Sequence, residues 1–207
     1  MTLPTLDEFV DLLRNRPLLD VATNYVLGQD TFAFASRRKR NQLRTLMAHL
    51  SQQLNISSER ITIVGSGKVG FSLDPEKFGR PFNRRSDIDF LVVDSAMFDQ
   101  IWLNLIRWQY PRRQALPHSD REFAANRRRN VYWGWFEPDE IQIDDLSVPE
   151  LLRPLRDVKV KWFNAFQSLS RYEELASRRY DGRLYRTWEH ALAYQMDGLR
   201  QIKERHL

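Results

Sequence analysis

Two aspartates separated by one residue, Asp87 and Asp89, are the strongest chemical feature of the sequence. They open a run rich in β-branched and aromatic residues, 88–93, which favours a β-strand. Because side chains alternate along a strand, both carboxylates are expected on one face, about 7 Å apart, with Ile88 and Phe90 turned into the core. Two carboxylates this close repel each other unless a cation lies between them. Mg²⁺ prefers such oxygen ligands together with substrate phosphates, so the pair predicts a metal site that binds a triphosphate.

A second chemical feature, Gly65-Ser66, follows the short run 61–64, which predicts a buried strand. Glycine lets the backbone approach a phosphate closely, and Ser66 offers a hydroxyl and a backbone amide. A helix that begins here would add a partial positive charge, and Lys68 would add a full one. We therefore expect Gly65, Ser66 and Lys68 to contact phosphates.

An apolar strand ending in Gly-Ser, then a gap, then Asp-x-Asp within an apolar strand resembles the signature of the polymerase-β-like nucleotidyltransferase superfamily. The matching segments are Ile63-Val64-Gly65-Ser66 and Ser86-Asp87-Ile88-Asp89-Phe90-Leu91-Val92-Val93. The resemblance implies that Gly65 and Ser66 hold the triphosphate of a nucleoside triphosphate (NTP), and that Asp87 and Asp89 bind Mg²⁺ or Mn²⁺.

A second resemblance is to small bacterial nucleotidyltransferase-domain proteins found in antiphage or toxin–antitoxin contexts. The segments that carry it are Phe71-Ser72-Leu73, Trp133-Gly134-Trp135 and Gly182-Arg183-Leu184-Tyr185-Arg186.

Active members of the superfamily carry a third carboxylate on a later strand. By this resemblance the best candidate for a third metal ligand and catalytic residue is Asp144, with Asp145 and Glu137 as weaker options. If the third acid is missing, catalysis is in doubt while nucleotide binding is not. The gap between the two motifs also exceeds the usual spacing, and the insert 73–85 would account for it as a loop over the site.

Basic residues outside the two motifs could bind anions. Lys77, Arg84 and Arg85 lie close to the expected triphosphate site in the sequence. The run 127–129 is all arginine and precedes an aromatic-rich segment, 131–136. Basic residues interleaved with aromatic ones can bind single-stranded nucleic acid by charge and stacking. The alternative is that the aromatic side chains are core residues beneath a solvated basic rim.

Other catalytic classes find little support in the sequence. Thr62 and Val69 stand where a P-loop needs a glycine and a serine or threonine. Serine hydrolase motifs are absent, and the lack of cysteine excludes thiolate metal sites, cysteine nucleophiles and disulfides. The four histidines, His49, His118, His190 and His206, show no metal-ligand spacing. We expect His49 and His190, which lie on predicted helices, to be surface or packing residues.

The elements that would position these residues follow from apolar periodicity and capping signals. Strands are expected at 61–64, 87–93 and 131–136, and residues 74–85 as a loop. Helices are expected at 6–27 with an interruption near Arg16-Pro17, at 36–54, from a Ser95 cap, at 149–156 and 158–177, and from Thr187. Helices around a βαβ-like centre predict an α/β or α+β fold, a small mixed sheet flanked by helices.

The 207 residues suit one compact unit, with 42% apolar residues to form a core. We expect N-terminal helices in 1–55, a nucleotidyltransferase-like core in 56–147 and a helical segment in 148–207. No long apolar run indicates a membrane span, and the start of the chain lacks a signal-peptide pattern, so we expect a cytoplasmic protein. The net charge of +5 favours polyanionic partners such as nucleotides or RNA.

Three functions remain open at the level of sequence. The first is a metal-dependent nucleotidyltransferase acting on an NTP, with an RNA, protein or nucleotide acceptor. The second is an inactive relative that serves as a regulatory or antitoxin-like partner protein. Its interface would lie in the C-terminal half, where aromatic residues gather: Trp162, Phe163, Phe166, Tyr185 and Trp188. The third is a basic RNA-binding module.

Overall fold

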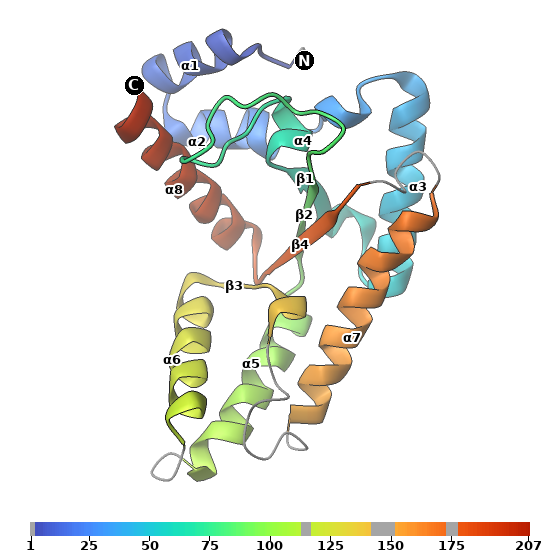
Figure 1. Ribbon diagram of the computed structural model, residues 1–207, viewed down its shortest axis with the longest axis vertical. Helices are drawn as coiled ribbons and strands as arrows, with labels where there is room; N and C mark the ends of the chain where they lie inside the picture. Colours follow the sequence, from blue (N-terminus) through green and yellow to red (C-terminus); the bar gives the residue numbers. More distant parts are fainter. Residues whose placement is uncertain (1–2, 113–116, 142–151, 173–177) are drawn as a thin grey trace.

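The computed structural model describes residues 3–112, 117–141, 152–172 and 178–207 (Figure 1). The longer helices are α1 (Leu6–Asn15), α3 (Arg37–Leu54), α5 (Ser95–Gln109), α6 (His118–Trp133), α7 (Arg153–Gln167) and α8 (Trp188–His206). Single-turn or irregular helices are α2 (Leu18–Val21), η1 (Ala22–Val26), η2 (Phe32–Phe34), η3 (Ser58–Arg60), α4 (Ser66–Val69), η4 (Tyr110–Arg112), η5 (Pro138–Glu140) and η7 (Ser168–Arg171). No helix in these ranges has the length and apolar character needed to cross a membrane.

Four strands in the described residues form one mixed sheet in the order β1-β2-β4-β3, as the α+β expectation required: β1 (Ile61–Val64), β2 (Ile88–Val93), β4 (Tyr180–Tyr185) and β3 (Trp135–Phe136). Strands β1 and β2 run antiparallel, so the expected βαβ-like centre is wrong. The connection between them holds only the single turn α4, whereas a parallel crossover usually needs a full helix. The parallel neighbour of β2 is instead the distant strand β4.

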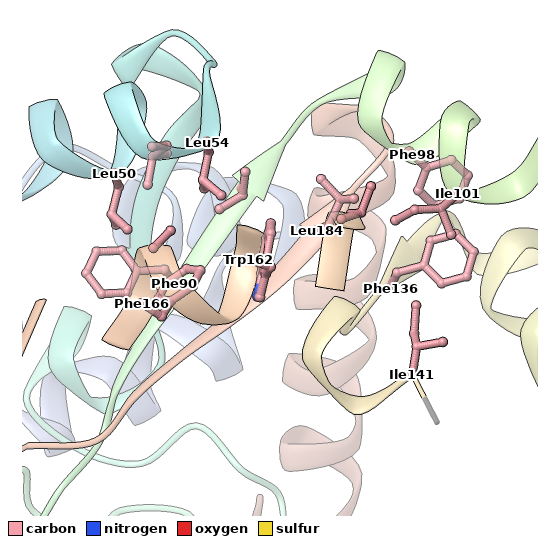
Figure 2. Packing of buried hydrophobic residues seen from close by; sticks show 14 of the residues in the cluster. Leu50, Leu54, Phe90, Phe98, Ile101, Phe136, Ile141, Trp162, Phe166 and Leu184 are labelled. Carbon is pink, nitrogen blue, oxygen red and sulfur yellow. The ribbon is translucent and has the colours of Figure 1, made fainter. Parts of the chain in front are cut away.

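One face of the sheet carries the main core. Ile88, Phe90 and Val92 of β2 pack there with side chains from α3, α5 and α7, which cover this face (Figures 1 and 2). Leu50, Trp162 and other large residues surround Phe90 in Figure 2. Ile88 and Phe90 lie in this core whereas Leu91 and Val93 lie in a separate cluster, which confirms the alternation expected from the sequence.

The opposite face of the sheet is covered by α8 and the N-terminal helices. Leu91 and Val93 pack against Tyr185 and Ala191. Further along α8, Leu199 and Ile202 join a second cluster with residues of α1, α2 and η1. This places both ends of the chain on the same side of the molecule (Figure 1). Asp89 alternates with Ile88 and Phe90, so it is on this second face, where it lines a cavity.

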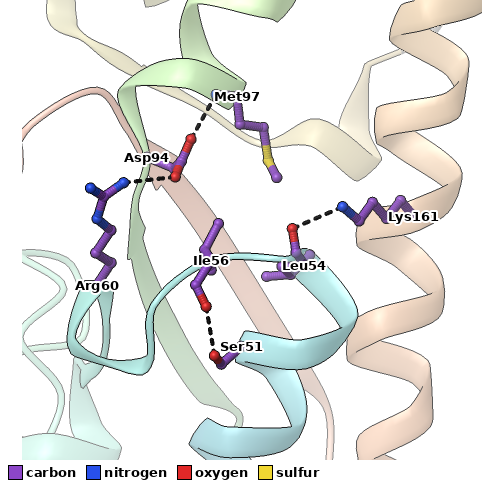
Figure 3. Close-up of polar contacts among 7 residues, drawn as sticks. All are labelled: Ser51, Leu54, Ile56, Arg60, Asp94, Met97 and Lys161. Carbon is purple, nitrogen blue, oxygen red and sulfur yellow. Dashed lines mark hydrogen bonds and ion pairs between the residues drawn. The ribbon is translucent and has the colours of Figure 1, made fainter.

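Polar contacts fix the junction at the far end of β2 (Figure 3). Asp94, not the expected Ser95, caps α5 by accepting a hydrogen bond from the Met97 amide at 2.7 Å. The other carboxylate oxygen of Asp94 accepts from Arg60 at 3.0 Å. Lys161 donates to the Leu54 carbonyl at 2.8 Å and so ties the end of α3 to α7. The two bonds of Asp94 thus anchor the chain directly after β2, at the end opposite to Asp87 and Asp89.

Helix α6 replaces most of the strand expected at 131–136. The helix continues to Trp133 and ends where Gly134 adopts a φ of 72°, so only Trp135 and Phe136 remain for β3. A side chain at position 134 would collide with His190, which makes glycine necessary there. The two helices expected at 149–156 and 158–177 also differ from the structure, since one helix, α7, spans Arg153–Gln167.

Candidate active site

A cavity of about 600 Å³ opens where β2 begins. Its walls are the end of β1, the starts of β2 and β4, the connection 72–87 and the first part of α8. Its lining includes these charged, hydroxyl-bearing or phenolic side chains: Ser66, Asp74, Lys77, Arg80, Arg85, Asp87, Asp89, Glu137, Asp181, Arg183, Tyr185 and Tyr194. The structure therefore brings the two sequence motifs to one place.

Asp87 and Asp89 both line this cavity. Asp89 lies within β2, opposite Val64 of β1, and Asp87 lies just before the strand begins. They occupy alternate positions from Ile88 and Phe90, which are buried in the main core. The strand period thus turns the carboxylates toward the cavity.

Asp181 is a third carboxylate in the cavity, and the sequence reasoning missed it. In the parallel register of β2 and β4 it is the direct neighbour of Asp89, and neighbouring strands lie about 4.8 Å apart. One Asp181 carboxylate oxygen accepts a hydrogen bond from the Gly182 amide at 2.7 Å. The available signal was the alternation across 180–185, which places Asp181 and Arg183 on one face and Leu184 on the other.

The carboxylates chosen from the sequence as third ligands have different outcomes. Asp144 and Asp145 lie outside the described residues. Glu137 lines the cavity but forms an ion pair with Arg183. In the part of the chain that the structure describes, no three His, Cys, Asp or Glu side chains converge closely enough to hold a metal ion by themselves.

The negative charge around Asp89 is only partly compensated. The pKa of Asp89 is raised from 3.8 to about 6, mainly by burial and then by the nearby carboxylates of Asp181 and Asp87, while the charge of Arg183 opposes the rise. A cation between these groups would relieve both the repulsion and the cost of burial. Mg²⁺ needs only one or two carboxylates when substrate phosphates and water complete its shell, so Asp87 and Asp89 fit its donor chemistry.

Gly65 forms the floor beside Asp89. Its backbone has φ 65° and ψ −149°, a conformation that is almost restricted to glycine. A β-carbon at this position would come within 2.6 Å of Asp89 Oδ2. The next residue, Ser66, begins α4 and lines the cavity. The Gly-Ser pair therefore reaches the carboxylates, as its spacing suggested.

Lys68 does not lie at the cavity, contrary to expectation. It is buried, with 1% of its surface exposed, and its ammonium group donates to the Gly28 carbonyl. Successive helical residues turn by about 100°, so Lys68 points away from the direction of Ser66 two positions earlier. Burial lowers the pKa of Lys68 from 10.5 to about 8, an effect that the charge of Asp30 opposes.

The connection 72–87 folds over the cavity and contributes most of its positive charge. Lys77, Arg80 and Arg85 line the cavity, but Arg84 does not. The segment doubles back on itself, since the Ser72 amide donates to the Arg80 carbonyl at 2.8 Å. Arg178 anchors its end by donating to the carbonyls of Asn83 and Ser86 at 3.0 and 2.8 Å. The insert is thus a folded wall of the site.

Arg183 is a basic residue whose charge acts on the carboxylate of Asp89. Its guanidinium lies 4.6 Å from the ring centroids of both Trp135 and Tyr194 and pairs with Glu137. The two rings and the ion pair restrict its orientation. Arg183 therefore presents a fixed positive charge to the same wall of the cavity as Asp89.

A second cavity of about 450 Å³ adjoins the first and shares Asp89, Arg183 and Tyr194 with it. It extends along α8, where Gly198 lines it. A β-carbon on Gly198 would meet no atom within 4 Å, so this helical glycine is not needed for packing. Its absence of a side chain keeps the second cavity open.

Histidines take structural positions, as expected for those on helices. His49 shares a hydrogen bond with Ser168 Oγ at 2.6 Å, and His190 Nδ1 lies 2.9 Å from Thr187 Oγ1. Neither lines the main cavity.

Comparison of the chain with protein-family models, with curated proteins and with solved structures found no match.

Proposed function

We propose that the chain is a metal-dependent nucleotidyltransferase, which moves a nucleoside monophosphate from an NTP to a hydroxyl acceptor. The acceptor oxygen forms a bond to the α-phosphorus, and the bond from that phosphorus to the bridging oxygen breaks. Pyrophosphate leaves, and the hydroxyl proton passes to water. Candidate acceptors are RNA, a protein side chain or another nucleotide.

The observation that carries this proposal is the meeting of both motifs in one cavity. Asp87, Asp89 and Asp181 line it together with Gly65 and Ser66. A structural ion-pair network would balance its acids with bases, whereas among the described residues whose charges shift the pKa of Asp89, two carboxylates, Asp181 and Asp87, outnumber one cation, Arg183. This imbalance favours a site for a cation and its phosphate ligand.

Asp87 and Asp89 would hold Mg²⁺ or Mn²⁺, with Asp181 beside them. When bound, the metal supplies Lewis acidity for the attacking hydroxyl and neutralises charge on the leaving pyrophosphate. Ser66 and the neighbouring amides would bind phosphate oxygens. Arg80, Arg85 and Lys77 would balance the remaining charge of the triphosphate, since they line the same cavity.

The experiment is transfer of label from α-³²P NTPs, with Mg²⁺ or Mn²⁺, into protein, RNA or small products. Wild type is compared with the single variants Asp87→Ala, Asp89→Ala and Asp181→Ala. Asp157→Ala is the matched control, since it removes an exposed carboxylate on α7 outside the cavity. We expect label from wild type and from the control, and only background from the Asp87 and Asp89 variants. Equal labelling by all the variants would refute the proposal.

A non-catalytic, nucleotide-binding partner protein is the second candidate. It is favoured by the finding that no three acidic or histidine side chains in the described ranges converge on one metal position. NTP binding without label transfer would support it. Its interface would differ from that expected from the sequence, because Trp162, Phe166 and Tyr185 are buried in the fold, while Phe163 and Trp188 are exposed.

A further inference from the structure

The last turns of α6 carry two large aromatic side chains that the fold does not use. Tyr132 is 78% exposed and Trp133 is 58% exposed, although both belong to residue types that normally supply buried area. Their rings pack edge to face, with centroids 5.2 Å apart and planes at 84°. Helix α6 is at the outer edge of the molecule beside α5 (Figure 1). The expectation that these aromatic residues form core beneath a basic rim is therefore wrong for Tyr132 and Trp133.

Two exposed arginines accompany these rings. Arg128 precedes Tyr132 by four residues and Arg129 precedes Trp133 by four, so each arginine shares a helix face with one ring. The third arginine, Arg127, is turned inward and lies over the Phe123 ring at 5.6 Å. No acidic residue occurs between Ala125 and Trp133. The surface formed by Arg128, Arg129, Tyr132 and Trp133, here called the α6 platform, thus combines accessible rings with positive charge.

We propose that the α6 platform binds single-stranded nucleic acid. Bases stack on exposed aromatic faces regardless of sequence, and arginines attract the phosphate backbone. A protein partner is less favoured, because the other exposed position in these turns, Ala125, adds little apolar surface around the rings. The proposal does not depend on catalysis, so it stands apart from the proposed transfer reaction.

The α6 platform lies close to the main cavity. Trp133 is four residues before Glu137, which lines the cavity, so their Cα atoms are at most about 14 Å apart. Trp135, between them, packs against Arg183 and Tyr194 of the cavity wall. A strand bound on the platform would therefore pass close to the cavity.

The test is fluorescence anisotropy of labelled ten-nucleotide RNA and DNA single strands titrated with the full chain. Tyr132→Ala with Trp133→Ala should weaken binding at least about fivefold, given the usual effect of losing base–aromatic stacking. Arg128→Ser with Arg129→Ser should reduce the slope of log affinity against log salt concentration by about 1.4. The relative affinities for RNA and DNA show which of the two kinds of single strand the platform prefers.

Matched control variants distinguish binding at the α6 platform from nonspecific electrostatic binding of nucleic acid to a basic protein. Arg37→Ser with Arg40→Ser removes two exposed charges at the start of α3, and Phe163→Ala removes an exposed ring on α7. Neither control should change binding as much as the platform variants do. The proposal would be overturned if the chain bound neither RNA nor DNA, or if the control variants weakened binding as much as the platform variants. It would also be overturned if the wild type formed an oligomer that the Tyr132 and Trp133 changes dissociate. Melting temperatures check that every variant folds.

Discussion

A carboxylate oxygen of Asp89 lies so close to Gly65 that a β-carbon added to the glycine would come within 2.6 Å of it. Antiparallel pairing sets this approach, since Val64, which precedes Gly65, is opposite Asp89 in the sheet. The two sequence motifs are thus in contact through one strand pair. Their proximity turns two separate patterns into one site.

Replacement of Gly65 by alanine should both destabilise the fold and disturb the site. The positive φ and the contact with Asp89 together predict a loss of roughly 2–4 kcal/mol in the free energy of unfolding. Urea denaturation measures it. Gly67→Ala is the control, because its added carbon meets only ordinary contacts, the nearest at 3.5 Å. In an Asp89→Ala background, the cost of Gly65→Ala should fall, since only the backbone strain remains; an unchanged cost would show that the contact is not the cause.

Asp89→Asn should stabilise the metal-free protein while abolishing label transfer. The substitution removes one of three crowded negative charges, and we expect a gain on the order of 1–2 kcal/mol in unfolding free energy. Added Mg²⁺ should raise the melting temperature of wild type. At a concentration ten times the Kd, the gain in the free energy of unfolding should be about 1.4 kcal/mol. Chelation should reverse this. A variant that responds to Mg²⁺ as strongly as wild type would contradict the assignment of Asp89 as a ligand.

The lowered pKa of the buried Lys68 should make the stability of the fold depend on pH in the alkaline range. Its pKa is about 8 in the folded chain and 10.5 ordinarily, so between these values the unfolded chain binds more protons. The free energy of unfolding should therefore rise with pH across this window, by on the order of 3 kcal/mol from this residue. Below pH 8 both states are protonated, and the full cost of burying the charge remains.

The measurement for Lys68 is urea denaturation of wild type and Lys68→Met between pH 7 and 10. The variant should lack the rise, and the difference between the two proteins should shrink or change sign as pH increases. Lys203→Met, at an exposed position on α8, controls for the loss of one positive charge. Parallel pH profiles for wild type and Lys68→Met would show that Lys68 keeps its ordinary pKa.

Gly198 offers a test of the second cavity. Alanine in a helix interior is favoured over glycine, and no atom opposes the added carbon, so Gly198→Ala should stabilise the chain by about 0.5–1 kcal/mol. Gly198→Gln would fill part of the cavity. If a ligand group occupies this space, the glutamine variant should weaken nucleotide binding or transfer while remaining folded. Full activity in Gly198→Gln would show that the second cavity takes no part.

Local patterns in the sequence predicted several elements correctly. The β-branched run 61–64 became β1, the apolar period of 36–54 became α3, and Thr187 caps α8. Alternation along β2 predicted that Asp87 and Asp89 face away from Ile88 and Phe90. These features depend on neighbours within a few residues, so the sequence alone contains the physical cause.

Features that depend on distant partners were not predictable in this way. Asp181 joins the site only because β4 pairs in parallel with β2 across about ninety residues, and no local pattern encodes that register. The segment 131–136 looked like a strand because of its aromatic residues. In the structure the helix of the preceding residues continues to Trp133, and the position of His190 requires the glycine that stops it.

The sequence by itself determined which residues could bind a metal and phosphates: two aspartates in alternation on one strand and a glycine-serine turn after another. The tertiary structure decided which of the other candidates share their cavity. It placed Asp181 and Arg183 there, turned Lys68 into the interior and left Tyr132 and Trp133 at the surface. The reason is physical: side-chain type and period are local properties, whereas strand pairing and helix packing depend on which distant segments bury one another's apolar faces.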